Sequence, residues 1–393
     1  MAEQAVPHID GRCDARFEGV RAAFTENFRV RGELGAAVTV LLDGEPVVDL
    51  WGGWADAART RPWERDTLVN VWSTTKGATA LCAHLLADRG LLDLDAPVAA
   101  YWPEFAAAGK ADLPVRHLLS HRAGLAGLRE PHTLAQLYDW ELTTARLAAT
   151  APWWEPGTRS GYHALTYGFL VGEVIRRITG QLPSAFLREE VCGPLGIDFS
   201  IGLPEKEAGR AAELVHPPAA PGSAQAAAAS QLPPVALAAL ANPLTGAADA
   251  NTPAWRAAEL PAAGGHGTAR GVAALYGLLI GPDHADGRSL LSAPAAERVR
   301  EGQGGCRDLV LGAAFEHDTE VGLGLWLSGA NGSYGPNPRA FGHDGFGGSC
   351  GLADPEAGLS IGYVMNHMGG HIANDPRKMA LIEAVYAAGV ASA

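Results

Sequence analysis

The stretch Trp72-Ser73-Thr74-Thr75-Lys76 opens a segment that has the pattern of a helix. Residues three apart lie on one face of a helix, so Ser73 and Lys76 are expected within reach of each other. A serine hydroxyl becomes a good nucleophile when a base removes its proton. A lysine amine can be that base if its pKa is lowered by burial or by a neighbouring cation. The start of a helix also offers free N–H groups and partial positive charge to an oxyanion at Ser73.

The Ser-x-x-Lys pattern alone leaves two interpretations open. A chance match to Ser-x-x-Lys is uncommon in this chain because it has only four lysines: Lys76, Lys110, Lys206 and Lys378. A serine that caps a helix beside a solvated lysine would nevertheless give the same pattern. The other segments of the chain must decide.

Composition limits the classes of protein that fit. The 393 residues are 47% hydrophobic, enough for one large core or a core divided between two lobes. The net charge of −13 argues against nucleic acid or an anionic membrane as the main partner. The N-terminus lacks a basic region followed by an apolar run, and no apolar stretch approaches transmembrane length. We therefore expect a cytoplasmic protein.

The cysteines and histidines give no sign of a metal site. The five cysteines are scattered and never form a Cys-x-x-Cys pair: Cys13, Cys82, Cys192, Cys306 and Cys350. This odd number fits reduced thiols better than a disulfide framework. The 13 histidines show no His-Glu-x-x-His spacing. No metal and no cofactor are expected.

Strand patterns occupy both ends of the chain. Apolar runs at 36–42 and 47–53 flank the turn signal Asp43-Gly44-Glu45-Pro46, which predicts a β-hairpin. Near the C-terminus, strands are predicted at 322–327, 339–343, 349–353 and 359–368, with a terminal helix at 375–388.

Helical patterns fill the middle of the chain. They are clearest at 73–90, 165–178 and 269–279. The Ala- and Pro-rich segment 216–256 is interpreted as an irregular covering segment. Strands at both ends with helices between them predict an α+β fold, in which one antiparallel sheet is built from both chain ends and a mostly helical lobe is inserted. The predicted sheet lobe comprises 1–72 and 291–393, and the predicted helical lobe 73–290.

Two further segments could meet Ser73 at the seam between these lobes. In Pro156-Gly157-Thr158-Arg159-Ser160-Gly161-Tyr162-His163, a tyrosine follows a Gly-rich turn just before a helix. In Phe341-Gly342-His343-Asp344-Gly345-Phe346-Gly347-Gly348-Ser349, glycines on a strand edge allow close approach of a ligand. Each alone fits an ordinary core aromatic or a surface histidine equally well.

Taken together, five segments in order resemble the class C β-lactamase-like serine hydrolases, and most closely their esterase branch, the family VIII carboxylesterases. The resemblance runs from about Gly35 to the terminal helix. It is carried by Ser73 to Lys76, His117-Leu118-Leu119-Ser120-His121-Arg122-Ala123-Gly124-Leu125, Pro156-Gly157-Thr158 with Tyr162, Gly264 to Arg270, and His343-Asp344-Gly345. It implies a β-lactamase/transpeptidase-like fold.

The resemblance also implies roles for particular residues. Ser73 would be the acylated nucleophile, Lys76 its base, and Tyr162 a partner in the proton relay to the leaving group. His343-Asp344-Gly345 matches the third motif of the family, Lys-Thr-Gly in β-lactamases. The N–H groups of Ser73 and Phe346 would form the oxyanion hole.

Two departures from the family pattern bear on the substrate. Ala164 replaces the Asn of the Tyr-x-Asn motif. His343 replaces the Lys of Lys-Thr-Gly, so a fixed cation for a substrate carboxylate is missing. β-Lactams and peptidoglycan stems carry such a carboxylate. The departures favour small, uncharged acyl esters and weak or no β-lactamase activity.

Two other motifs compete with this interpretation. Gly347-Gly348-Ser349-Cys350-Gly351 matches the Gly-x-Ser-x-Gly elbow of α/β-hydrolases, but Ser349 leads into a predicted strand where a helix is required. Gly264-Gly265-His266-Gly267 lacks the Gly-Lys-Ser/Thr of a phosphate loop, and a tight turn into a helix is favoured there.

The sequence thus predicts a serine esterase that works through an acyl-enzyme on a small acyl ester. The alternatives are an acyltransferase, which passes the same acyl group to an amine or alcohol, and a catalytically idle scaffold. Trp72, Trp154 and Asp344 are predicted to contact the substrate.

Overall fold

Both ends of the chain meet in one antiparallel sheet. The structure is a computed structural model, which describes residues 7–216, 232–282, 289–305, 307–312, 320–329 and 332–390. Its seven strands run in the order β1-β3-β2-β10-β9-β8-β7. Their bounds are β1 Ile9–Cys13, β2 Gly35–Leu42, β3 Glu45–Gly53, β7 Trp326–Leu327, β8 Phe341–Asp344, β9 Cys350–Asp354 and β10 Leu359–Met365. The predicted α+β fold, with a sheet built from both chain ends, is confirmed.

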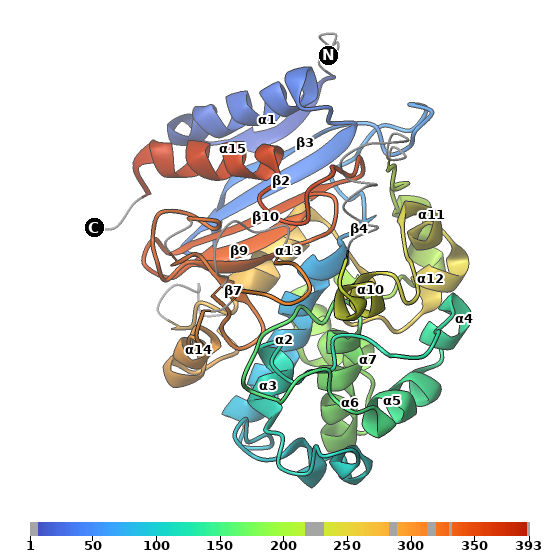
Figure 1. Ribbon diagram of the computed structural model, residues 1–393. Helices are drawn as coiled ribbons and strands as arrows, with labels where there is room; N and C mark the ends of the chain where they lie inside the picture. The colour runs from blue at the N-terminus through green and yellow to red at the C-terminus, as the bar shows by residue number, and fades with distance from the viewer. Residues whose placement is uncertain are drawn as a thin grey trace.

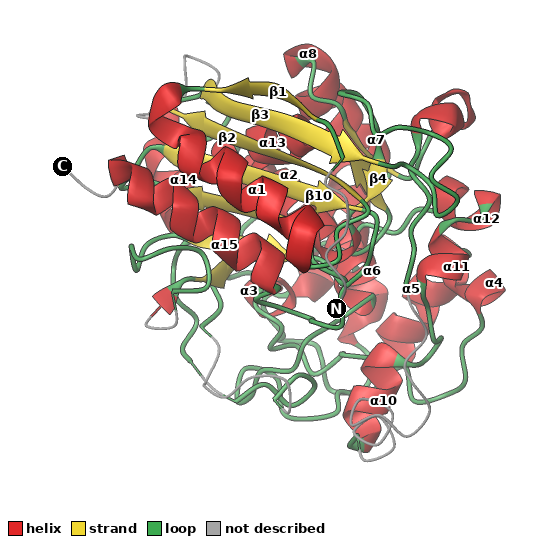
Figure 2. Cartoon of the chain, turned by 90° about the horizontal axis from the view of Figure 1, so that it is seen from above, coloured by secondary structure: helices red, strands yellow, loops and turns green. Residues whose placement is uncertain are grey.

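The central strands are buried along most of their length because helices cover both faces of the sheet. All seven residues of β10 are buried, as are the first six of β2. Helices α1 (Glu18–Val30) and α15 (Pro376–Val385) pack together on one face, and α13 (Ala269–Gly277) packs against β2, β9 and β10 on the other. Figure 1 shows the blue α1 beside the red α15, and Figure 2 shows both in front of the sheet with α13 behind it.

The helical lobe is built around α2 (Thr75–Asp88), the helix that follows Ser73. Every residue from Thr75 to Leu86 is buried, as expected for a helix that is surrounded on all sides. It packs against α6, α7, α13 and α14. The other helices of this part are α3 Val115–Leu119, α4 Leu134–Leu137, α5 Trp140–Ala149, α6 Thr166–Thr179, α7 Pro183–Leu187, α8 Gly193–Leu195, α10 Pro234–Leu240, α11 Ala247–Ala250, α12 Pro253–Ala257 and α14 Ala293–Val299.

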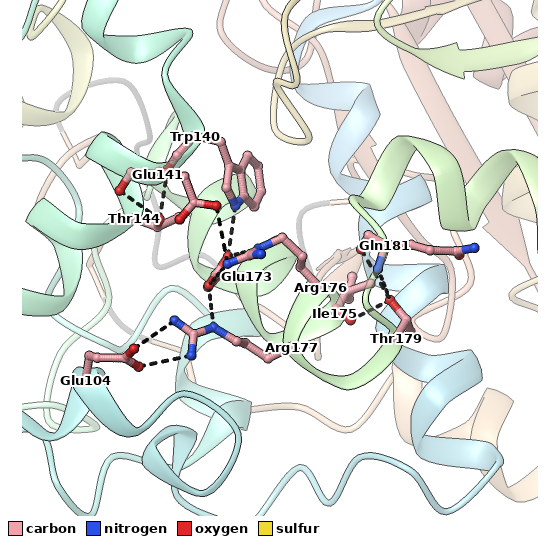
Figure 3. A network of polar contacts seen from close by, with 10 residues as sticks. All are labelled: Glu104, Trp140, Glu141, Thr144, Glu173, Ile175, Arg176, Arg177, Thr179 and Gln181. Carbon is pink, nitrogen blue, oxygen red and sulfur yellow. Dashed lines mark hydrogen bonds and ion pairs between the residues drawn. The ribbon is translucent and has the colours of Figure 1, made fainter.

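A buried carboxylate on α6 ties this helix to α5, which carries Trp140, and to the short 3-10 helix Pro103–Ala106, which carries Glu104. Glu173 on α6 accepts hydrogen bonds from Trp140 Nε1 at 2.8 Å and from the Nε atoms of Arg176 and Arg177 at 2.7 Å each, and Arg177 also pairs with Glu104 (Figure 3). Burial raises the pKa of Glu173, but these hydrogen bonds outweigh it and the net pKa is lowered. The charge is therefore paired, as a buried carboxylate requires.

A small second sheet differs from the sequence prediction. Strands β4 (Val69–Asn70), β6 (Gly265–Gly267) and β5 (Phe199–Ile201) pair in the order β4-β6-β5, whereas 264–267 was expected to be only a turn into a helix. A Cβ on Gly265 would collide with Thr75, and one on Gly267 with Phe199, so these glycines allow the strand to lie close to α2 and β5. The predicted strand at 322–327 is also shortened to Trp326–Leu327, because the chain bends at 323–325.

The predicted division into 1–72, 73–290 and 291–393 stays a prediction, and α13, which it assigns to the helical lobe, lies on the sheet. Of the Ala- and Pro-rich segment 216–256, residues 217–231 lie outside the described residues, and α10, α11 and most of α12 lie in the rest. Within the described ranges, no helix is both long and apolar enough to cross a membrane.

Candidate active site

Ser73 lies in a short 3-10 turn, Trp72–Thr74, that leads directly into α2. Trp72, just before it, has a φ of +48°, an unusual conformation for a bulky side chain. Asn70 Oδ1 accepts the Trp72 N–H at 3.2 Å, and the Trp72 ring packs against Trp255 and Phe346, with centroids 5.2 and 5.6 Å away. Backbone strain held in place by packing is a common feature of functional sites.

Lys76 lies under Ser73 with its side chain fully buried. Its Nζ atom is 3.0 Å from Ser73 Oγ and donates to the carbonyl oxygens of Ala164 at 2.7 Å and Ala262 at 3.1 Å. Burial lowers the pKa of Lys76 well below its ordinary value. A neutral amine has two N–H groups and one lone pair; the two carbonyls take the N–H groups, which leaves the lone pair for the Ser73 hydroxyl proton.

Tyr162 approaches Ser73 from the segment 156–163, which precedes α6. Its side chain is buried, and the Lys76 Nζ atom lies 4.8 Å from the centre of its ring. Burial raises the pKa of Tyr162, so its phenol is a proton donor at neutral pH. Its N–H donates to Asp308 Oδ1 at 3.1 Å, and the same oxygen accepts the N–H groups of Val310 and Leu311 at 2.8 Å each.

His343 and Asp344 lie on β8, beside Tyr162. His343 is buried and its Nδ1 lies 2.7 Å from the carbonyl oxygen of Asp344. Burial lowers the pKa of His343 to about 3, so the imidazole is neutral. The Asp344 carboxylate accepts hydrogen bonds from Lys378 Nζ at 2.9 Å and from the Asn374 N–H at 2.9 Å, and is thus held by the C-terminal region.

The loop between β8 and β9 is fixed close to the start of the Ser73 turn. Ser349 Oγ donates to the Val71 carbonyl oxygen at 2.8 Å, and Arg377 Nη2 donates to the Gly347 carbonyl oxygen at 2.7 Å. A Cβ on Gly345 would collide with Ser349 Oγ and the Val71 carbonyl, so only glycine fits there. Among the described residues, the Phe346 N–H makes no hydrogen bond.

A cavity of about 210 Å³ brings most of the predicted site residues together. Its walls include Trp72, Ser73, Tyr162, His343, Asp344 and Phe346. The remaining wall is largely apolar and includes Leu240, Leu244, Leu311, Trp326 and Ile372. Trp154 is not among the lining residues; its Nε1 donates to the Arg159 carbonyl oxygen at 3.0 Å. In the described part of the chain, no group of three or more metal-binding side chains is found.

Sequence reasoning missed several parts of this site. Asp308 lies 146 residues from Tyr162, and nothing in its sequence neighbourhood marks it. Leu240 and Leu244 belong to the segment interpreted as a cover, and they prove to line the cavity. The buried partner of Asp344, Lys378, is separated from it by 34 residues.

Comparison with known proteins agrees with this geometry. The "Beta-lactamase" family profile matches residues 20–385. "Esterase/beta-lactamase LipL" of Mycobacterium tuberculosis is 38% identical over 380 residues, which cover 92% of this chain and 83% of LipL.

Solved structures give the same result at the level of the fold. A crystal structure of a family VIII carboxylesterase is 44% identical, with a TM-score of 0.90 and coverage of 97% of this chain and 100% of that one. A penicillin-binding protein homologue from Caulobacter crescentus is 43% identical, with a TM-score of 0.88 and the same coverage. The resemblance inferred from the five motifs is confirmed, and the chain belongs to the beta-lactamase family of serine hydrolases.

Proposed function

We propose that this protein is a carboxylesterase that hydrolyses small neutral esters through an acyl-enzyme on Ser73. The observation that carries the proposal is the 3.0 Å distance from Lys76 Nζ to Ser73 Oγ, with both amine N–H groups directed to carbonyl oxygens. In this arrangement the lysine accepts a proton from serine without first losing one to solvent.

The reaction then follows from the surrounding groups. Ser73 Oγ attacks the ester carbonyl carbon while its proton passes to Lys76 Nζ. The negative oxygen of the tetrahedral intermediate accepts hydrogen bonds from the N–H groups of Ser73 and Phe346. As the intermediate collapses, Tyr162 gives its proton to the leaving alcohol and recovers one from Lys76, which restores both groups. Water then attacks the acyl-enzyme by the same proton path in reverse and releases the acid.

The cavity favours uncharged substrates. The histidine in place of the family's lysine is neutral, and the nearby Lys378 is already paired with Asp344. A substrate carboxylate would therefore be desolvated without a counter-ion, which is unfavourable. LipL is described as both an esterase and a β-lactamase. For this chain we propose that ester hydrolysis exceeds β-lactam hydrolysis by at least about 100-fold in kcat/KM.

Detection of the acyl-enzyme by intact mass tests this function. After rapid quenching with a butyrate ester, the wild-type protein is expected to gain one butyryl group, located on the peptide that contains Ser73. The Ser73→Ala variant is expected to gain none and to lose hydrolysis. Full hydrolysis by a folded Ser73→Ala variant would exclude the proposal. Addition of an alcohol or amine during turnover distinguishes esterase from acyltransferase, because a new ester or amide then appears among the products.

A further inference from the structure

His343 lines the cavity and carries a buried hydrogen-bond acceptor without a partner among the described residues. His343 is 2% exposed, and among the described residues its Nε2 atom has no hydrogen-bond partner. Its other ring nitrogen, Nδ1, lies 2.7 Å from the Asp344 carbonyl oxygen. A carbonyl oxygen only accepts, so Nδ1 carries the proton and Nε2 presents a lone pair.

This tautomer can bind a donor but cannot bind an anion. Burial lowers the pKa of His343 to about 3, so Nε2 is unprotonated across the neutral range. A buried acceptor without a partner is unfavourable, typically by about 1–3 kcal/mol. A ligand that brings a hydroxyl or N–H donor to this atom removes that penalty.

The position of the ring indicates which part of the substrate meets it. The His343 ring centre lies 6.0 Å from that of Tyr162 and 5.5 Å from that of Trp326, and both rings line the same cavity as Ser73. In the proposed reaction Tyr162 protonates the leaving alcohol, so the alcohol part of the ester passes over Tyr162 and beside His343.

We propose that His343 Nε2 accepts a hydrogen bond from a free hydroxyl next to the ester oxygen on the alcohol part, so that monoesters of vicinal diols and glycerol-like polyols are the preferred substrates. This specificity rests on the function proposed above. It assigns to the third-motif histidine a role that a lysine at the same position would not have, because an ammonium group donates hydrogen bonds and accepts none.

Three butyrate esters test the proposal. The substrates are 2-hydroxyethyl, propyl and 2-methoxyethyl butyrate, which form the same butyryl-enzyme, so kcat/KM compares acylation alone. The propyl group has the size of hydroxyethyl, and the methoxyethyl group keeps the electron-withdrawing oxygen but lacks the donor. The wild-type protein is expected to prefer the hydroxyethyl ester over both others by about ten-fold or more.

Two substitutions separate recognition from general damage. His343→Leu removes the acceptor and is expected to bring the three kcat/KM values together. His343→Gln supplies an amide oxygen as acceptor and is expected to retain part of the preference. Labelling of Ser73 by a fluorophosphonate in each variant shows whether the nucleophile is intact.

The outcomes are distinguishable. Equal rates for the hydroxyethyl and methoxyethyl esters in the wild-type protein, or a preference that persists in His343→Leu, would overturn this specificity while leaving the esterase intact. Hydrolysis that continues in Ser73→Ala would instead overturn the proposed function. If neither His343 variant folds, the wild-type comparison of the three esters decides.

Discussion

Ser349 Oγ donates a hydrogen bond to the carbonyl oxygen of Val71 at 2.8 Å and lies 3.2 Å from Thr74 Oγ1. The serine of the Gly-x-Ser-x-Gly motif is thus buried and committed to the backbone just before the Ser73 turn. It joins the loop that carries Phe346 to the segment that carries Ser73, the two segments that supply the N–H groups of the proposed oxyanion hole.

Substitution of Ser349 should therefore weaken the structure more than the chemistry. In Ser349→Ala the Val71 carbonyl loses the hydroxyl donor and keeps only the Thr74 N–H at 3.2 Å, for which we expect a decrease of about 1 kcal/mol in the free energy of unfolding. Fluorophosphonate labelling should persist, with kcat/KM reduced by less than about ten-fold. Urea unfolding and intact mass measure both effects. A folded Ser349→Ala protein that no longer reacts would show that Ser349, not Ser73, is the nucleophile.

The two buried lysines Lys76 and Lys110 form a matched pair for testing the base. Lys110 Nζ, like Lys76 Nζ, donates to backbone carbonyls, those of Ala107, Ala148 and Thr150, but among the described residues none of its hydrogen bonds involves Ser73. Lys76→Met should lower kcat/KM by at least about 1,000-fold. Lys110→Met should lower the unfolding midpoint because three carbonyls lose the Nζ donor, while the folded fraction keeps its kcat/KM. Comparable kcat/KM in the two variants would contradict the assignment of Lys76.

The pH profile of kcat/KM should report the protonation of Lys76. Burial lowers the pKa of Lys76, and the proposed base must be neutral, so activity is lost as pH falls through that lowered value and retained above it. Burial raises the pKa of Tyr162, so no loss from phenol ionisation is expected up to about pH 10. Stopped-flow acylation should reach its plateau well below the ordinary pKa of lysine. A midpoint near the ordinary lysine value, about 10.4, would argue against a buried base.

Five fully buried histidines should make the fold sensitive to mild acid. Burial lowers the pKa of one of them, His121, well below its ordinary value. Burial lowers the pKa of His84 and His266 to about 4 and of His163 and His343 to about 3. Because the unfolded values lie near 6.5, the unfolded state binds more protons below that pH, and stability present above it is lost as pH falls toward 4. Each histidine contributes a slope of about 1.4 kcal/mol per pH unit.

Urea unfolding at pH 7, 6 and 5 measures this effect. His84→Gln keeps a donor for the Leu323 carbonyl oxygen, to which His84 Nε2 lies at 2.8 Å, and removes one titrating ring, so the loss should be smaller by one histidine. His8→Gln changes a side chain that is 84% exposed and should leave the loss unchanged. An unfolding midpoint independent of pH over this range would show that these rings are protonated in the folded state.

Local pattern was enough to predict most of the secondary structure. Apolar runs bounded by turn signals predicted β2, β3, β9 and β10, and helical patterns predicted α2 and α6, because these signals come from residues that are neighbours in sequence. The short strands β4, β5 and β6 were missed. Each has only two or three residues, and their pairing depends on segments that are far apart along the chain.

For the site residues, too, the sequence determined some features and only the tertiary structure decided others. The sequence by itself determined that Ser73 and Lys76 share one helical face, since three residues of helix bring them together whatever surrounds them. Only the tertiary structure decided that the amine is enclosed by the carbonyls of Ala164 and Ala262, that Asp344 pairs with Lys378, and that Trp154 lies off the cavity wall. Spacing is a property of neighbouring residues, whereas burial, and with it the protonation state of Lys76, Tyr162 and His343, depends on the packing of the whole chain around them.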